Sequence, residues 1–442
     1  MGTYIPSTKG ERDEMLASLG LPAGEEGYRK LYSDVPESVF RSHELDLPEG
    51  MSELSVVRKM TRIAGENKTY QTILRGAGAY DHYIPAIVKS IPNKEEFLTA
   101  YTPYQAEINQ GILQSIFEYQ TMICGLTGMD VSNASVYDGA TAAAEAAAMC
   151  RSPKRRVTLV SATTNPEVIS VIRTYCYGAG TELRIVPAKD GRTDVSKLAE
   201  MLTEDVAGLY LQQPNFYGLF EDAKAIGELV HAHKAMYIMG CSPIALSVMA
   251  TPGECGADIA VGEGQSLGLP LAYGGPYLGY MATTSKNMRK LPGRIVGQTT
   301  DHEGKRAYVL SLQAREQHIR REKASSNICS NEALCALTAS VYMAYMGPSG
   351  MKEVAMQSMS KAHYLAKKLT AIPGVRLRYS GAFFDEFLTD MPKADAVLEA
   401  LDAEGILGGL PVEEGILWCA TEKVSKDAMD HTAAIVKEVL AQ

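Results

Sequence analysis

The sequence predicts an α/β protein with three parts: a helical N-terminal arm, a large domain with a mostly parallel sheet, and a small C-terminal α/β domain. Strand and helix patterns alternate from residue 157 to 284, and parallel strands require such crossover helices. Beyond residue 325, long apolar helices precede a second, shorter set of strands and helices. We therefore expect the arm over residues 1–75, the large domain over 76–325 and the small domain over 326–442.

Composition and charge narrow the class of protein. Of the 442 residues, 46% are hydrophobic and 21% are charged, which is typical of a soluble globular chain. No apolar run approaches the roughly 20 residues of a membrane span, and the N-terminus lacks a secretory signal pattern. The net charge of −9 argues against nucleic acid or an anionic membrane as a partner. Eight cysteines without a Cys-x-x-Cys pair indicate neither zinc nor a disulfide framework, so we expect a cytoplasmic protein without a metal.

The arm carries two helical patterns. Residues 9–21 are amphipathic and end at Gly20 and Pro22, and a second helix follows the turn at residues 46–48. These segments are too short and polar to form a large core, so we expect the arm to pack on another surface, such as another subunit.

Two irregular segments, at residues 76–85 and 100–111, combine hydrogen-bonding side chains with glycine and proline. Their notable side chains are Tyr80, His82, Tyr83, Tyr101, Tyr104, Gln105 and Glu107. Such loops often hold recognition sites, although tyrosines that only pack by their rings would give the same pattern. A helix is expected next, over residues 111–126.

The stretch from residue 133 to 150 predicts a tight turn at Asp138-Gly139 that opens a helix made mostly of alanine. Thr141 suits its first turn. The unpaired N–H groups of a helix start can bind an anion, although a buried helix that binds nothing fits equally well.

The remaining elements follow in order. We expect strands at residues 157–161, 182–187, 206–213, 235–240 and 258–263, with helices opening at Asn165, at Asp194 and at residue 222. Ligands of such sheets bind at the carboxyl ends of the strands, where the start of the alanine-rich helix would lie. The last part predicts helices at 327–346 and 351–369, strands at 375–380, 383–389 and 416–421, and helices at 393–404 and from 425.

Seven long motifs carry a resemblance to a known family. They lie at residues 76–85, 100–105, 117–124, 137–141, 256–265, 273–279 and 315–324. The chain resembles the glycine dehydrogenase (decarboxylating) family, the P-proteins of the glycine cleavage system, in the form of the first of two subunits. The resemblance runs nearly end to end. It implies the aspartate-aminotransferase-like fold of fold type I pyridoxal-phosphate (PLP) enzymes.

This resemblance also implies where a cofactor would be held. A fold type I enzyme needs a lysine after the strand that ends near residue 262, but residues 256–280 contain none, and Gln265 stands at the equivalent position. Ser242 replaces the expected acid, and the ring-stacking position falls near Thr164 or Asn165. We expect a relict cofactor site formed by Asp138, Gly139, Thr141, Asn165, Ser242 and Gln265, and no covalently bound cofactor on this chain.

The function implied by the resemblance is therefore shared between subunits. A second, homologous subunit would bind PLP and decarboxylate glycine, and the aminomethyl group would pass to the lipoylated H-protein within a heterotetrameric enzyme. The two tyrosine-rich loops would supply one wall of the partner's site. A purely structural subunit, or a self-sufficient PLP enzyme that uses another lysine, are the alternatives.

A basic run offers weaker anion candidates. Arg315, Arg320 and Arg321, together with His318, could bind a carboxylate or phosphate through bidentate contacts. A run of alternating charge also fits a solvated, salt-bridged surface.

Overall fold

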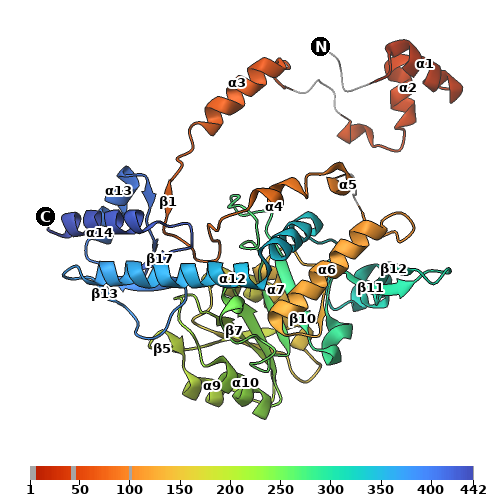
Figure 1. Cartoon of the computed structure of the whole chain (residues 1–442). Coiled ribbons are helices and arrows are strands. Elements are labelled where there is room, and N and C mark those ends of the chain that lie inside the picture. Colours follow the sequence, from red (N-terminus) through yellow and green to blue (C-terminus); the bar gives the residue numbers. More distant parts are fainter. Residues whose placement is uncertain (1–5, 41–45, 99–101, 442) are drawn as a thin grey trace. The chain divides into compact units, whose positions relative to one another are not determined.

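The computed structural model describes residues 6–40, 46–98 and 102–441, and it divides into two compact units, Met1–Lys68 and Thr69–Gln442 (Figure 1). The described residues of the first unit form three α-helices: α1 (Lys9–Ser18), α2 (Gly24–Leu31) and α3 (Glu53–Ala64). Thr8 begins α1 with a capping box, and the Ser52 side chain caps α3. The sequence pattern predicts α1 and α3 but not α2.

A seven-stranded sheet forms the centre of the second unit, in the order β2-β10-β9-β8-β7-β3-β4. The five strands from β9 to β4 are parallel, and β10 and β2 add antiparallel pairs at one side. Their bounds are β2 Val131–Ser132, β3 Val157–Ser161, β4 Glu182–Val186, β7 Val206–Gln213, β8 Met236–Cys241, β9 Ile259–Glu263 and β10 Gly279–Thr283. The predicted mostly parallel sheet is confirmed.

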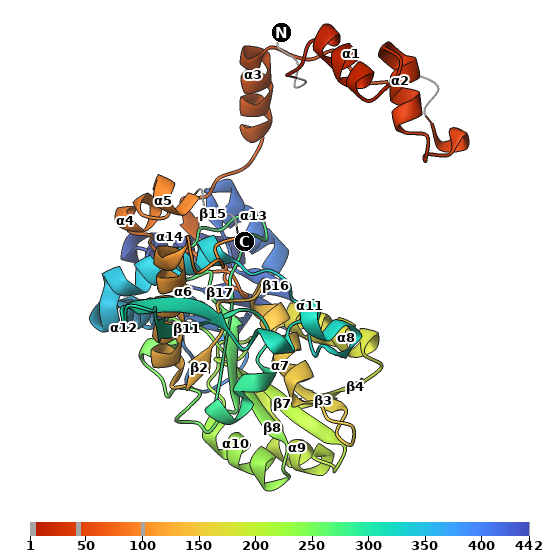
Figure 2. The ribbon, with the colours of Figure 1, turned by 90° about the vertical axis from the view of Figure 1, so that its right-hand side faces the viewer.

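Helices cover both faces of this sheet (Figures 1 and 2). Successive side chains of a strand point to opposite faces, and β7 shows this alternation. Leu209 and Leu211 enter a core shared with α6, α9, α10 and α12, whereas Tyr210 enters a core shared with α7 and α8. The bounds are α6 Gln110–Thr127, α7 Gly139–Cys150, α8 Pro166–Gly178, α9 Val195–Met201, α10 Ala223–Ala232 and α12 Ala333–Thr370. The sheet is thus a layer between two helical layers.

The C-terminal part has its own core. A four-stranded antiparallel sheet, β13-β14-β17-β16, packs with α13, α14 and the second half of α12 around the buried Trp418. The elements are β13 Arg376–Leu377, β14 Glu386–Asp390, α13 Ala394–Ala403, β15 Ile406–Leu407, β16 Leu410–Val412, β17 Gly415–Cys419 and α14 Lys426–Ala441. Strand β1 (Thr72–Ile73), inside the segment expected to be the arm, pairs with β15.

Several expected elements differ in extent. The two helices expected before and after residue 347 join as α12, which bends at Gly347 because that residue has φ 59° and ψ 179°. Residues 327–332 are not helical, and the strand expected at 375–380 shrinks to the two residues of β13. The prediction omitted a hairpin and several short elements: α4 Ala86–Ser90, α5 Glu95–Leu98, β5 Ala188–Lys189, β6 Arg192–Thr193, β11 Ile295–Thr300, β12 Arg306–Ser311 and α11 Gln317–Arg320.

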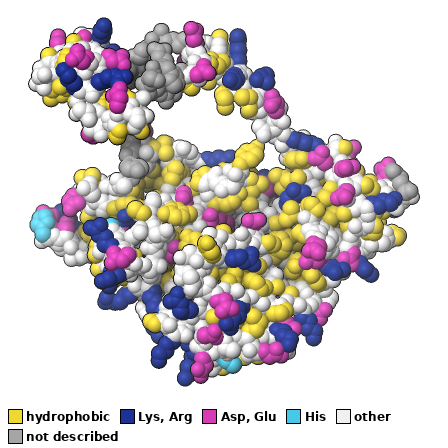
Figure 3. All heavy atoms as spheres, turned by 180° about the vertical axis from the view of Figure 1, so that it is seen from behind, with side chains coloured by type: hydrophobic (Ala, Val, Ile, Leu, Met, Phe, Trp, Pro, Cys, Tyr) yellow, Lys and Arg dark blue, Asp and Glu magenta, His cyan; other side chains and the backbone are white. Residues whose placement is uncertain are grey.

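None of the helices in the described ranges combines the length and apolar character needed to cross a bilayer. The surface of the second unit mixes charged and hydrophobic side chains, and on the face shown in Figure 3 hydrophobic ones gather towards its middle. Its exposed large hydrophobic residues include Tyr83, Ile87, Tyr273, Tyr345 and Met356.

Candidate functional site

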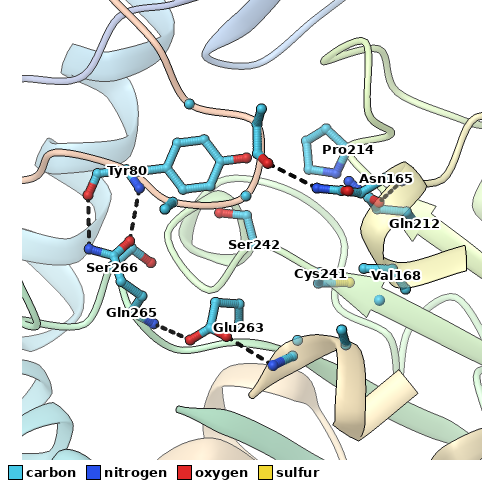
Figure 4. Close-up of a pocket in the computed structure, with 18 of the residues that line it drawn as sticks. Tyr80, Asn165, Val168, Gln212, Pro214, Cys241, Ser242, Glu263, Gln265 and Ser266 are labelled. Atoms are coloured by element: carbon cyan, nitrogen blue, oxygen red, sulfur yellow. Dashed lines mark hydrogen bonds between the residues drawn. The ribbon is translucent and has the colours of Figure 1, made fainter. Parts of the chain in front are cut away.

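A cleft of about 350 Å³ opens at the carboxyl ends of the parallel strands. Its walls come from the loop at residues 76–80, the starts of α7 and α8, and the ends of β7, β8 and β9 (Figure 4). Residues 385 and 386 of the small C-terminal layer close one side. This is the edge of an open α/β sheet where ligands usually bind.

The start of α7 forms the floor of the cleft. Asp138 caps this helix, and its carboxylate accepts the N–H of Thr141 at 2.7 Å. The N–H of Gly139 donates to Glu263 at the end of β9, at 2.9 Å. Only glycine fits at position 139, because a Cβ there would lie 2.7 Å from the backbone nitrogen of Glu263.

Gln265 holds the loop above the cleft. Its side-chain oxygen accepts the N–H of Tyr80 at 2.8 Å, and its side-chain nitrogen donates to the Tyr80 carbonyl at 3.0 Å (Figure 4). The same nitrogen donates to the carbonyl of Leu269 at 2.9 Å. These three hydrogen bonds of the buried amide therefore all go to backbone groups of this chain.

Two more side chains fix the same loop. The Asn165 side chain donates to the carbonyl of Ala77 at 2.9 Å. Glu386 accepts the N–H of Ala77 at 2.6 Å and the hydroxyl of Tyr80 at 2.8 Å. The loop is consequently attached to the large sheet through Asn165 and Gln265, and to the small layer through Glu386.

The cleft is acidic. Five of its described lining residues are Asp138, Glu167, Glu263, Asp385 and Glu386, and none of the described lining residues is a lysine, arginine or histidine. Burial raises the pKa of Glu263 to about 7, against the N–H donors that favour its ionised form. Burial also raises the pKa values of Asp385 and Glu386. No positive charge of the lining residues offsets these acids.

These residues do not fit PLP, the cofactor that the fold implies. The lining residues supply no amine for an imine, and the side chain at the expected lysine position is already hydrogen-bonded to backbone. The helix start that would receive a phosphate faces the carboxylates of Asp138 and Glu263. Like charges about 5 Å apart repel by about 3 kcal/mol at an effective dielectric constant of about 20, so a phosphate there would be disfavoured.

Five of the six residues expected to form a relict site line this cleft. They are Asp138, Gly139, Asn165, Ser242 and Gln265, and Thr141 is bonded to Asp138. Glu263 and Glu386, which also line the cleft, are not among the residues expected from the sequence. The signal for Glu263 was an acid at the end of a parallel strand, two residues before the expected lysine position. For Glu386, no local signal exists, because its contact with residues 77 and 80 depends on tertiary structure.

The residues of the first tyrosine-rich segment have different surroundings. The Tyr80 hydroxyl faces Glu386, and the buried His82 lies 2.6 Å from a carboxylate oxygen of Glu422. Tyr83 projects outward with 63% of its surface exposed. Of the three side chains, Tyr83 is thus the most exposed to a partner.

The second segment lies elsewhere. The Tyr104 hydroxyl donates to Asn331, and the Arg294 guanidinium carbon lies 5.0 Å from the centroid of the Tyr104 ring. Gln105 and Glu107 are exposed, whereas Tyr101 lies outside the described residues.

The basic run does not line the cleft. The Arg315 guanidinium donates to the carbonyls of Leu291 and Gly293, which indicates a structural role. Arg320 and Arg321 are exposed, and Arg320 donates to the carbonyl of Ala314 at 3.1 Å. An anion-binding role for these residues stays a prediction.

Comparisons with known proteins agree with this fold. The profile of the family described as "Glycine cleavage system P-protein" matches residues 2–436. A relative from Moorella thermoacetica, "Probable glycine dehydrogenase (decarboxylating) subunit 1", is 51% identical over 99% of this chain and 100% of its own length. A crystal structure of glycine decarboxylase (P-protein) in inhibitor-bound form has a TM-score of 0.92 at 41% identity, covering 99% of this chain and 100% of that one.

A more distant structure, alanine–glyoxylate aminotransferase from Nostoc sp., has a TM-score of 0.58 at 16% identity, covering 91% of this chain and 98% of its own. At that identity the likeness shows the fold alone, and the expected fold type I architecture is confirmed. The full-length matches establish the family: this chain belongs to the glycine cleavage system P-proteins.

Proposed function

We infer that this chain is a subunit of a glycine-decarboxylating enzyme of the glycine cleavage system and that it leaves cofactor binding to a homologous second subunit. The observation that carries this inference is the cleft at the start of α7, whose described lining residues include no lysine. The full-length relative named as subunit 1 supports the existence of a second subunit. In this proposal the second subunit holds PLP and decarboxylates glycine, and lipoylated H-protein receives the aminomethyl group. The relatives are bacterial, and we place the complex in the cytoplasm.

We propose that the loops contribute to the partner's site through their exposed residues. Tyr83, Gln105 and Glu107 are exposed. The second unit also exposes large hydrophobic side chains, such as Tyr273. Aromatic side chains such as tyrosine are enriched in protein–protein contacts. Tyr80 and His82 would act indirectly, because their hydrogen bonds to Glu386 and Glu422 fix the backbone that presents Tyr83.

The experiment is glycine–bicarbonate exchange with purified components. We expect no exchange with this chain alone, and exchange when the homologous subunit and lipoylated H-protein are added. The complementary measurement is borohydride reduction with PLP, followed by peptide mass analysis. A lysine of this chain labelled in proportion to activity, together with exchange by this chain alone, would contradict the proposal.

The second candidate function is that of a purely structural subunit, and the hydrogen bonds of the loop side chains favour it. Tyr80, His82 and Tyr104 all have hydrogen-bond partners within this chain. Replacing Tyr83 by alanine separates the two roles. We expect exchange to fall about tenfold or more in an intact complex if Tyr83 helps to form the partner's site, which corresponds to about 1.4 kcal/mol. Tyr177→Ala, at an 87% exposed tyrosine near the end of α8, is the matched control. Unchanged turnover with Tyr83→Ala would favour the structural subunit.

A further inference from the structure

The carboxylate of Glu263 is surrounded by backbone donors. Its Oε1 atom accepts the N–H groups of Gln265 and Leu278, both at 2.9 Å, and its Oε2 atom accepts the N–H of Gly139 at 2.9 Å. These donors belong to three segments: the loop after β9, the loop before β10 and the first turn of α7. One side chain therefore ties together the floor of the cleft (Figure 4).

Several backbone N–H groups that converge at a helix start make a typical site for a phosphate. Here a carboxylate of the same chain occupies that position. The packing is built for it, because glycine at position 139 is what lets the end of β9 approach the helix. Gly279 has a similar role, since a Cβ there would lie 2.3 Å from the carbonyl oxygen of Asp138.

We propose that the Glu263 side chain fills the phosphate position of this cleft, completes the fold without a cofactor and, because it occupies that space, keeps phosphate-bearing ligands out. This inference rests on the proposed function, in which the cofactor belongs to the homologous subunit. It adds a role for a residue of this chain, and it explains why the cleft can be both well formed and unsuited to PLP.

Two properties of Glu263 could exclude a phosphate, and they can be separated. One is the space that the side chain fills at Gly139, and the other is its negative charge. Glu263→Ala and Glu263→Ser both open this space. The serine variant covers the case in which the alanine variant folds poorly, because its hydroxyl leaves one polar group near the backbone donors. Glu263→Gln keeps the space filled while removing the charge. Glu167→Ala is the matched control, because Glu167 is an exposed acid on the same cleft that accepts no hydrogen bond from α7 in the described contacts.

The measurement is the thermal midpoint of the full-length chain as inorganic phosphate or PLP is titrated. We expect the midpoint of Glu263→Ala to lie roughly 5 °C below that of the unchanged chain, because three N–H groups lose their acceptor. We expect phosphate to raise the midpoints of Glu263→Ala and Glu263→Ser saturably, by about 2 °C at roughly tenfold excess over the dissociation constant. The unchanged chain, Glu263→Gln and Glu167→Ala should not respond.

Three outcomes would overturn the inference: phosphate raises the midpoint of the unchanged chain, neither opening variant responds, or Glu263→Gln responds as strongly as Glu263→Ala. The last would mean that charge alone excludes the ligand. These failures are distinct from failure of the proposed function, which is read from glycine–bicarbonate exchange and borohydride labelling of the unchanged proteins. A chain can be inactive alone, as proposed, while its Glu263 variants ignore phosphate.

Discussion

At the scale of single residues, Gln265 stands at the position expected to hold a cofactor lysine and has a structural role in this chain. Its side-chain amide bonds both backbone groups of Tyr80 and the carbonyl of Leu269. An amide suits this position because it offers an acceptor and donors at once, whereas an ammonium group has only donors. The loop that carries Tyr83 is therefore held by the side chain that stands at the expected lysine position.

Replacing Gln265 by alanine removes these three hydrogen bonds and leaves buried backbone groups without partners. We expect the free energy of unfolding to fall by about 2–3 kcal/mol, at about 1 kcal/mol for each bond. Denaturant unfolding of the full-length chain measures this change. Gln105→Ala is the control, because Gln105 is exposed and should change stability by less than about 0.5 kcal/mol. Equal stability of the two variants would show that Gln265 does not hold the loop.

At the scale of elements, α7 depends on a close approach to β9. Gly139→Ala would place a Cβ 2.7 Å from the nitrogen of Glu263, so α7 or β9 must move. We expect a loss of about 1–3 kcal/mol in the free energy of unfolding, which is typical of overpacking. Gly125→Ala is the matched control. It lies inside α6 with nothing within 4 Å of its Cβ position, and it should stabilise the chain by about 0.5–1 kcal/mol. Chemical denaturation of both variants checks the prediction, and a harmless Gly139→Ala would contradict it.

The elements also show what the sequence could predict. Local periodicity and capping residues located β3, α7 and α8 within one or two residues, because Asp138 and Asn165 are N-caps that act on their own neighbours. The helix start pointed to Asp138 and Gly139, whereas the family resemblance pointed to Asn165, Ser242 and Gln265, and all five line the cleft. Pairing between distant segments was not predictable, as with Thr72–Ile73 and Ile406–Leu407, because neither two-residue strand has a pattern of its own. The role of Glu263 was missed for the same reason, since it depends on how β9 sits against α7.

At the scale of the whole molecule, several acids are buried so deeply that neighbouring charges and hydrogen bonds do not offset the cost of ionising them. Burial raises the pKa values of Glu145 on α7 and Glu263 from 4.5 to about 7. It also raises those of Asp385 and Glu386. Acids whose pKa is lowered in the folded chain do not change the pH dependence of stability above pH 5. They are already ionised there in both the folded and the unfolded chain. Asp430 is one example, since the Lys368 ammonium group holds its pKa below the usual range.

The sign of the resulting pH dependence follows from proton binding. Between about pH 4.5 and 7 the folded chain holds protons on Glu145 and Glu263 that the unfolded chain has released, so stability falls as pH rises. A shift from 4.5 to about 7 corresponds to about 3 kcal/mol for each group. We therefore expect the free energy of unfolding to be several kcal/mol lower at pH 8 than at pH 5.5. Denaturant unfolding at both pH values measures it, and Glu145→Gln should reduce the difference by about 2 kcal/mol, the share of one such group between these pH values. A chain equally stable at both pH values would show that these carboxyl groups keep access to water in the folded state.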